Sequence, residues 1–72
     1  MSTLTEYREQ LGWSRATLAK EAGLTPQIII KAEDGEPITV RSATKIAQAL
    51  SRGFEKVIMA QHIEGLNVRK DS

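Results

Sequence analysis

Residues 15–34, RATLAKEAGLTPQIIIKAED, decide the fold of this chain. They are predicted to form two short helices that meet at Gly23, where a residue without a Cβ can adopt a positive φ. Thr25 is expected to be the N-cap of the second helix, with Pro26 at the first helical position, where the missing N–H costs nothing. Ala19 is small enough for the place where two inclined helices cross. This layout is typical of the helix-turn-helix, which places its second helix in the major groove of DNA.

Helix signals continue on both sides of this stretch. Thr3 and Glu6 have the spacing of a capping box, which predicts a helix that ends near Leu11. Ser14 is expected to cap the first helix of the quoted stretch, and Thr39 to cap a further amphipathic helix. The apolar stripe of that further helix consists of Val40, Ala43, Ile46, Ala47 and Leu50.

The last third of the chain carries weaker signals. We expect a loop or extended piece after Gly53, then a short helix near residues 60–64 that folds back onto the core. No segment strongly predicts a strand, and only residues 57–59 could compete for one. The predicted fold is therefore all-α, a compact bundle of four to five helices. The helix-turn-helix domain would occupy residues 1–66, and residues 67–72 would form a flexible C-terminal tail.

Composition narrows the possible functions. Seventy-two residues are enough for one small domain, and the absence of cysteine excludes disulfides and thiolate zinc sites. No stretch has the length of a membrane span or the core of a signal peptide, so a cytoplasmic location without membrane contact is expected. Ten Lys and Arg residues against nine Asp and Glu residues give a net charge of +1. A DNA-binding protein of this charge needs its basic residues on one face, or two copies acting together.

The residue types that carry catalysis or metal binding do not form a recognisable set. His62 is the only histidine, and no carboxylate stands at a clear ligand spacing from it, so no metal site is expected. Glu6 and Glu9 lie one turn apart on a solvated face, whereas a general acid needs burial or a paired charge. We therefore expect no enzymatic activity, no cofactor and no small-molecule substrate.

The chain resembles the lambda-repressor-like (XRE/Cro) DNA-binding domains of phage and bacterial regulators. The residues that carry the resemblance are LGWSRATLAKEAGLTPQIIIKAEDG at 11–35, Pro37 and Thr39 in the turn that follows, and KIAQAL at 45–50. The resemblance covers residues 4–50 and implies that the helix near 26–34 is the recognition helix. It also implies sequence-specific repression or activation of transcription by a dimer on a palindromic DNA site.

The same resemblance implies an internal ion pair. Arg8 and Glu33 occupy positions that often form such a pair in the family, and it would tie the recognition helix to the first helix. Removing one partner would leave a poorly solvated charge. The alternative is that these are two unrelated surface charges.

Helical geometry predicts which side chains of the recognition helix face DNA. If Ile29 is at the centre of the buried face, a rotation of 100° per residue turns Gln27, Lys31 and Asp34 outward. Ile30 also lies toward the outer side. Gln27 could then pair with adenine, Ile30 could contact thymine methyl groups, and Lys31 could reach guanine or a phosphate.

Contacts to the DNA backbone are expected from the starts of helices. Ser14 and Arg15 would grip a phosphate through backbone N–H groups and charge, although the family commonly has glutamine at the position of Arg15. Arg41 matches a family position that often approaches the backbone. Thr25 could donate to a phosphate in addition to capping its helix.

Two partners are considered. The low net charge favours a homodimer on double-stranded DNA, with residues 54–66 as the dimer surface. The alternative function is a protein-interaction or antitoxin-like module on the same fold, with weak or no DNA binding. In that case Ile28 and Ile30 would contact another protein, because exposed apolar patches mark interfaces.

Overall fold

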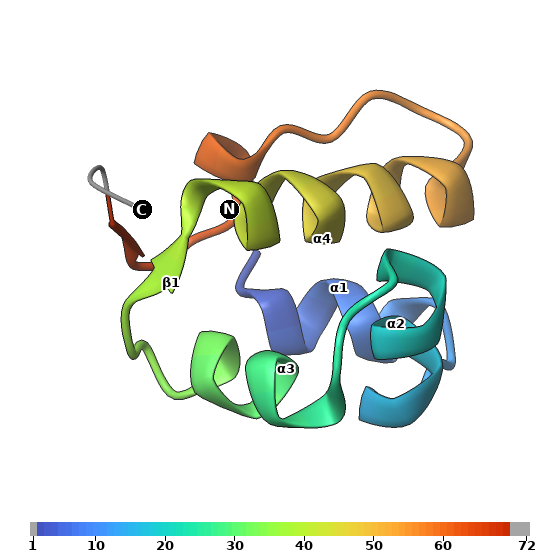
Figure 1. The fold of residues 1–72 in the computed structure, drawn as a ribbon. Coiled ribbons are helices and arrows are strands. Elements are labelled where there is room, and N and C mark those ends of the chain that lie inside the picture. Colours follow the sequence, from blue (N-terminus) through green and yellow to red (C-terminus); the bar gives the residue numbers. More distant parts are fainter. Residues whose placement is uncertain (1, 70–72) are drawn as a thin grey trace.

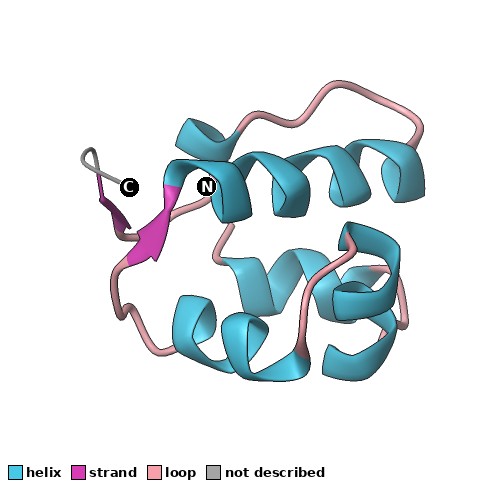
Figure 2. Ribbon diagram, viewed as in Figure 1, coloured by secondary structure: helices cyan, strands magenta, loops and turns pink. Residues whose placement is uncertain are grey.

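The computed structural model describes residues 2–69 and has four α-helices within this range (Figures 1 and 2). The helices are α1 (Leu4–Gln10), α2 (Arg15–Ala22), α3 (Pro26–Glu33) and α4 (Val40–Phe54). A single 3₁₀ turn, η1 (Ala60–His62), and two short strands, β1 (Ile38–Thr39) and β2 (Val68–Arg69), complete the elements. The predicted helical bundle is confirmed, with four α-helices rather than five. In Figure 1, α4 lies across the layer formed by the first three helices.

Local capping residues start three of the four helices as predicted. The Thr3 hydroxyl accepts the Glu6 backbone N–H at 3.2 Å, and the Glu6 carboxylate accepts the Thr3 N–H at 2.8 Å. The hydroxyls of Ser14 and Thr39 cap α2 and α4 by accepting the backbone N–H three residues on, from Thr17 and Ser42. Gly23 ends α2 with φ of 71°, the left-handed conformation that the turn requires.

Thr25 departs from the prediction. Its backbone is extended and stands at the N-cap of α3, but its side chain makes no capping hydrogen bond. The Ile28 N–H, which a capping hydroxyl would satisfy, donates instead to the Thr25 carbonyl oxygen at 3.1 Å. The first turn of α3 is therefore closed by the backbone, and the Thr25 hydroxyl is not used by the helix.

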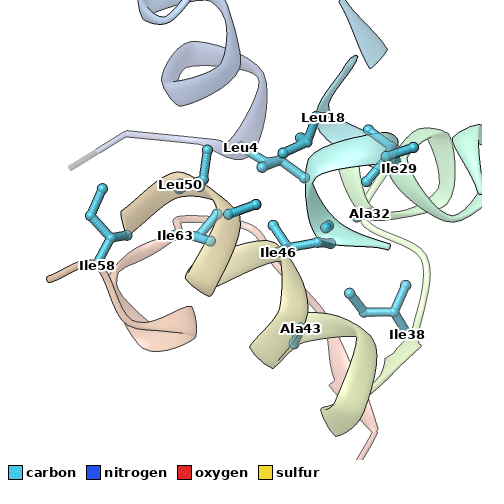
Figure 3. Packing of buried hydrophobic residues seen from close by; sticks show 13 residues of the cluster. Leu4, Leu18, Ile29, Ala32, Ile38, Ala43, Ile46, Leu50, Ile58 and Ile63 are labelled. Carbon is cyan, nitrogen blue, oxygen red and sulfur yellow. The ribbon is translucent and has the colours of Figure 1, made fainter. Parts of the chain in front are cut away.

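The core lies between α4 and the first three helices (Figure 3). Its fully buried centre consists of Leu18, Ile29, Ile46 and Leu50. Ala19 is 1% exposed, as expected for a small residue where α2 and α3 cross. Val40 was expected in the apolar stripe of α4, but it is exposed because it occupies the first position of that helix. Ala49 is buried in the same helix instead.

A glycine allows two side chains to lie against the backbone of α4. A Cβ built at Gly53 would stand 2.8 Å from Leu11 Cδ1 and 2.9 Å from the Trp13 ring. Both distances are shorter than real Cβ contacts, so a side chain at position 53 would require Leu11 or Trp13 to move away from α4. Trp13 accordingly packs against the core.

The C-terminal segment corrects two expectations. Val68 and Arg69 form a parallel pair of strands with Ile38 and Thr39, although no strand was predicted there, and residues 57–59 form none. The Ile38 N–H donates to the Asn67 carbonyl oxygen at 2.9 Å, so the expected flexible tail does not begin at residue 67. The remainder of that predicted tail, residues 70–72, lies outside the described residues. Strands of two residues carry no local pattern, which explains why the sequence did not indicate them.

The hydroxyl of Ser51 anchors the chain that returns along α4. Ser51 Oγ on α4 accepts the Ile58 N–H at 2.9 Å and donates to the Ala47 carbonyl oxygen at 2.8 Å. Ile58 is buried at 5% exposure, so its backbone N–H has little access to water. The short helix expected near residues 60–64 is the 3₁₀ turn η1, which packs on α4.

We predict that Ser51→Ala lowers the free energy of unfolding by about 1–3 kcal/mol, because the buried N–H of Ile58 loses its partner. Urea denaturation followed by circular dichroism measures this loss. Ser42→Ala is the matched control, since within residues 2–69 the Ser42 hydroxyl on the same helix bonds only to Thr39 Oγ1. Its effect should stay within about 0.5 kcal/mol. Equal losses in the two variants would contradict the anchoring role of Ser51.

Candidate nucleic-acid interface

The turn between α2 and α3 holds the two helices in a fixed relation. The Leu24 N–H donates to the Ala19 carbonyl oxygen at 2.8 Å across the turn, next to the left-handed Gly23. Leu24 packs against the core from this turn. The α2–α3 unit thus has the layout of the predicted helix-turn-helix (Figure 1).

The outward face of α3 carries the side chains that the helical rotation places there. Gln27, Lys31 and Asp34 are exposed, and Ile30 is 43% exposed. Within residues 2–69, none of these four side chains makes a hydrogen bond or ion pair. Ile29 and Ala32 on the inner face are buried. The four exposed side chains form an outer row that is available to an external partner.

The three consecutive isoleucines of α3 occupy three environments. Ile29 is fully buried, Ile28 is half-buried and packs on the edge of the core, and Ile30 is turned to solvent. Only Ile30 therefore presents a large apolar surface on the outer face.

The residues expected to grip the DNA backbone lie at helix starts. Ser14 precedes α2, Arg15 is its first residue, Thr25 precedes α3, and Arg41 is the second residue of α4. All four are exposed. The Ser14 hydroxyl is engaged as a cap, accepting the Thr17 N–H at 3.1 Å. The Thr25 hydroxyl and the Arg41 guanidinium make no hydrogen bond within the described residues.

Arg8 and Glu33 form the internal ion pair that the sequence suggests. Arg8 Nε lies 2.6 Å from Glu33 Oε2, and Arg8 Nη1 also donates to the Trp13 carbonyl oxygen at 3.0 Å. The two charged side chains are 12% and 4% exposed, respectively. The pair joins the first helix to the last residue of α3.

Arg15 also binds the Glu33 carboxylate, a contact that the sequence did not predict. Its Nε donates to Glu33 Oε1 at 2.9 Å, and its side chain remains 53% exposed. The two residues lie 18 positions apart on different helices, so no local pattern relates them. The one available signal was the arginine at a position that commonly holds glutamine in the resembled family. Glu33 thus binds one partly buried and one exposed arginine.

The family profile described as helix-turn-helix matches residues 4–57. This chain belongs to the lambda-repressor-like helix-turn-helix family. Neither a curated protein nor a solved structure matches the chain. The matched range contains all four helices of the described structure but ends before η1 and β2. Family membership supports a DNA-binding regulatory domain, and domains of this family are generally not enzymes.

The two arginines control the ionisation of Glu33 in this helix-turn-helix domain. Burial alone would raise the pKa of the Glu33 carboxyl, but hydrogen bonds and charges from Arg8 and Arg15 outweigh burial. The pKa of Glu33 is therefore lower than its ordinary value. The carboxylate is charged at neutral pH, and the ion pairs with both arginines are formed.

An apolar depression lies at the surface beside α4. It has a volume of about 260 Å³ and lies between α4 and the segment after it, with Ala47, Ile58 and Met59 in its lining. Val57 and Met59 are 80% and 49% exposed. The segment 54–66 was expected to form the dimer surface, but two of its large apolar residues, Ile58 and Ile63, are buried in the core. Val57 and Met59 are the large apolar side chains of this segment that remain exposed.

Other expectations concern metal and membrane contact. His62 Nδ1 accepts the Met59 N–H at 3.1 Å and thereby supports η1. In residues 2–69, the acidic and imidazole side chains do not form a group of three that could hold a metal ion. Every helix in this range is too short or too polar to cross a bilayer.

We predict that Glu33→Gln makes stability less dependent on pH in the acid range. A carboxyl whose pKa is lower in the folded state than in the unfolded state stabilises the fold above its unfolded pKa, about 4.3 for glutamate. That stabilisation is lost as pH falls from about 4.3 through the folded pKa. Thermal unfolding at several pH values should therefore show a steeper loss for wild type than for Glu33→Gln.

The control is Glu9→Gln, which changes an exposed carboxyl outside this cluster. It should keep the steep wild-type dependence. Parallel pH curves for wild type and Glu33→Gln would show that Glu33 is not stabilised by the two arginines.

Proposed function

We propose that this protein is a sequence-specific transcriptional regulator, repressor-like, that inserts α3 into the major groove of duplex DNA. The observation that carries the proposal is the outer row of α3, whose side chains are exposed and unengaged within the described residues. On a helix-turn-helix domain, that row is the surface that reads base edges.

Each side chain of the row suits a different base-pair feature. Gln27 has the donor and acceptor needed for a bidentate contact with adenine. Ile30 offers an apolar surface for a thymine methyl group, and Lys31 reaches guanine acceptors or a phosphate. Asp34 would repel a phosphate, so it disfavours backbone contact at that end of the helix.

Backbone contacts set the register of the protein on DNA without reading sequence. We assign them to the start of α2 with Ser14 and Arg15, to the hydroxyl of Thr25, and to Arg41 of α4. Thr25 is supported by its unused hydroxyl, which is not committed to capping α3.

Two copies are part of this proposal. A net charge of +1 gives a single copy little general attraction to DNA, and Glu33 further offsets the two arginines beside it. A homodimer would double the contacts and place two recognition helices about one DNA turn apart. Val57 and Met59, next to the apolar depression, are the proposed contact between copies.

The test is selection of bound sequences from a random duplex library, followed by titration against salt. We expect an enriched palindrome with half-sites about 10 bp apart, and affinity that falls steeply with salt. Gln27→Ala should cost about 1–3 kcal/mol of discrimination at one base pair. Lys31→Ala should weaken binding to all sequences if it contacts phosphate, with a salt slope smaller by about one.

Lys20→Ala is the matched charge control, because Lys20 is exposed on α2 and belongs neither to the outer row of α3 nor to the proposed contacts with the DNA backbone or a second copy. It should leave affinity and salt slope close to wild type. Uniform binding to all sequences, unchanged by Gln27→Ala, would contradict the proposal. The exposed Ile30 would then favour the protein-interaction or antitoxin-like module.

A further inference from the structure

We infer that Glu33 is a positioning residue for DNA binding, which holds Arg15 ready for one backbone phosphate. The inference rests on the proposed function and concerns the same surface. It assigns a role in DNA binding to an acidic residue that cannot itself attract a phosphate.

The contact geometry leaves most of the Arg15 guanidinium available. Only Nε is used, in the 2.9 Å hydrogen bond to Glu33 Oε1. Within residues 2–69, the two terminal nitrogens of Arg15 make no hydrogen bond. A guanidinium has five N–H donors in a rigid fork, so four donors remain for a phosphate while the bond to Glu33 is kept.

Glu33 is itself held in place before DNA arrives. Arg8 binds its Oε2 at 2.6 Å and is fixed in turn by the Trp13 carbonyl oxygen. The side chain of Glu33 is 4% exposed, whereas the side chain of Arg15 is 53% exposed. The anchor is therefore in the interior, and the arginine that it holds is at the surface.

This arrangement reduces the ordering that binding requires. A long side chain free in solvent loses rotamer freedom when it is immobilised at an interface. Arg15 is already restrained by Glu33, and Glu33 is the last residue of the recognition helix α3. The phosphate contact and the base-reading face are thus linked through one carboxylate.

The charges of the cluster are consistent with this role. Two guanidinium groups and one carboxylate leave a charge of +1, and Arg8 is largely buried. The excess positive charge is therefore accessible at Arg15. If Glu33 instead competed with phosphate for Arg15, removing Glu33 would strengthen DNA binding. The positioning role predicts that removing Glu33 weakens DNA binding.

A double-mutant cycle separates these roles, using the duplex enriched by selection. Affinity is measured at fixed salt for wild type, Glu33→Gln, Arg15→Gln and the double variant. We expect Glu33→Gln to weaken binding by about three- to tenfold when Arg15 is present, a coupling typical of contacting residues. In the Arg15→Gln background, Glu33→Gln should change affinity less than about twofold. Arg15→Gln alone should reduce the salt slope by about one.

Two results of the cycle would overturn the inference. An equal loss from Glu33→Gln in both backgrounds would mean that Glu33 acts only through Arg8 and the fold. Tighter binding by Glu33→Gln would mean that the carboxylate competes with phosphate. Failure of the proposed function is seen separately, as the absence of any enriched sequence for the wild-type protein.

A second measurement does not depend on the stability of Glu33→Gln. The Arg15 Nε–H is observed by NMR in the wild-type protein, free and bound to the enriched duplex. We expect a restrained Nε–H in both states, with its hydrogen bond to Glu33 retained in the complex. A mobile Nε–H in the free protein, or loss of the bond on DNA, would overturn the inference.

Discussion

The buried carboxylate of Glu33 is the interaction on which the arrangement of the first three helices depends. It belongs to α3, Arg8 belongs to α1, and Arg15 belongs to α2. A buried charge is costly unless it is paired, so the fold in which both arginines reach Glu33 is favoured over one in which α3 shifts. The position of α3 is thereby favoured by its ion pairs with α1 and α2 as well as by apolar packing.

Apolar packing determines which face of α3 remains available. Burial of Ile29 and Ala32 against the core leaves Gln27, Ile30 and Lys31 on the outside, because successive helical residues are turned by 100°. The candidate reading surface therefore consists of the α3 side chains that the core does not bury. Glu33 lies at the end of the same helix and connects this surface to Arg15.

The sequence predicts the features that depend on residues close together in the chain. Thr3, Ser14 and Thr39 start helices through bonds to N–H groups three positions away, and the buried side of α3 follows from its period. Two contacts between distant residues were missed, whereas the Arg8–Glu33 pair was expected from the family resemblance and not from a local pattern. The pairing of β1 with β2 spans about thirty positions, and Arg15 reaches Glu33 across two helices. Thr25 has the right residue type for a side-chain cap, but the backbone carbonyl of Thr25 satisfies the N–H instead.

The most direct test of the account is an NMR titration of the ¹⁵N-labelled protein with its enriched duplex. The account predicts that the largest backbone amide shifts occur in α3 from Gln27 to Lys31, with further shifts at Arg15 and Arg41. Exposed residues of α1, such as Glu9, serve as the internal reference. Unchanged α3 amides in a saturated complex would show that DNA binds elsewhere and would contradict the assignment of α3 as the recognition helix.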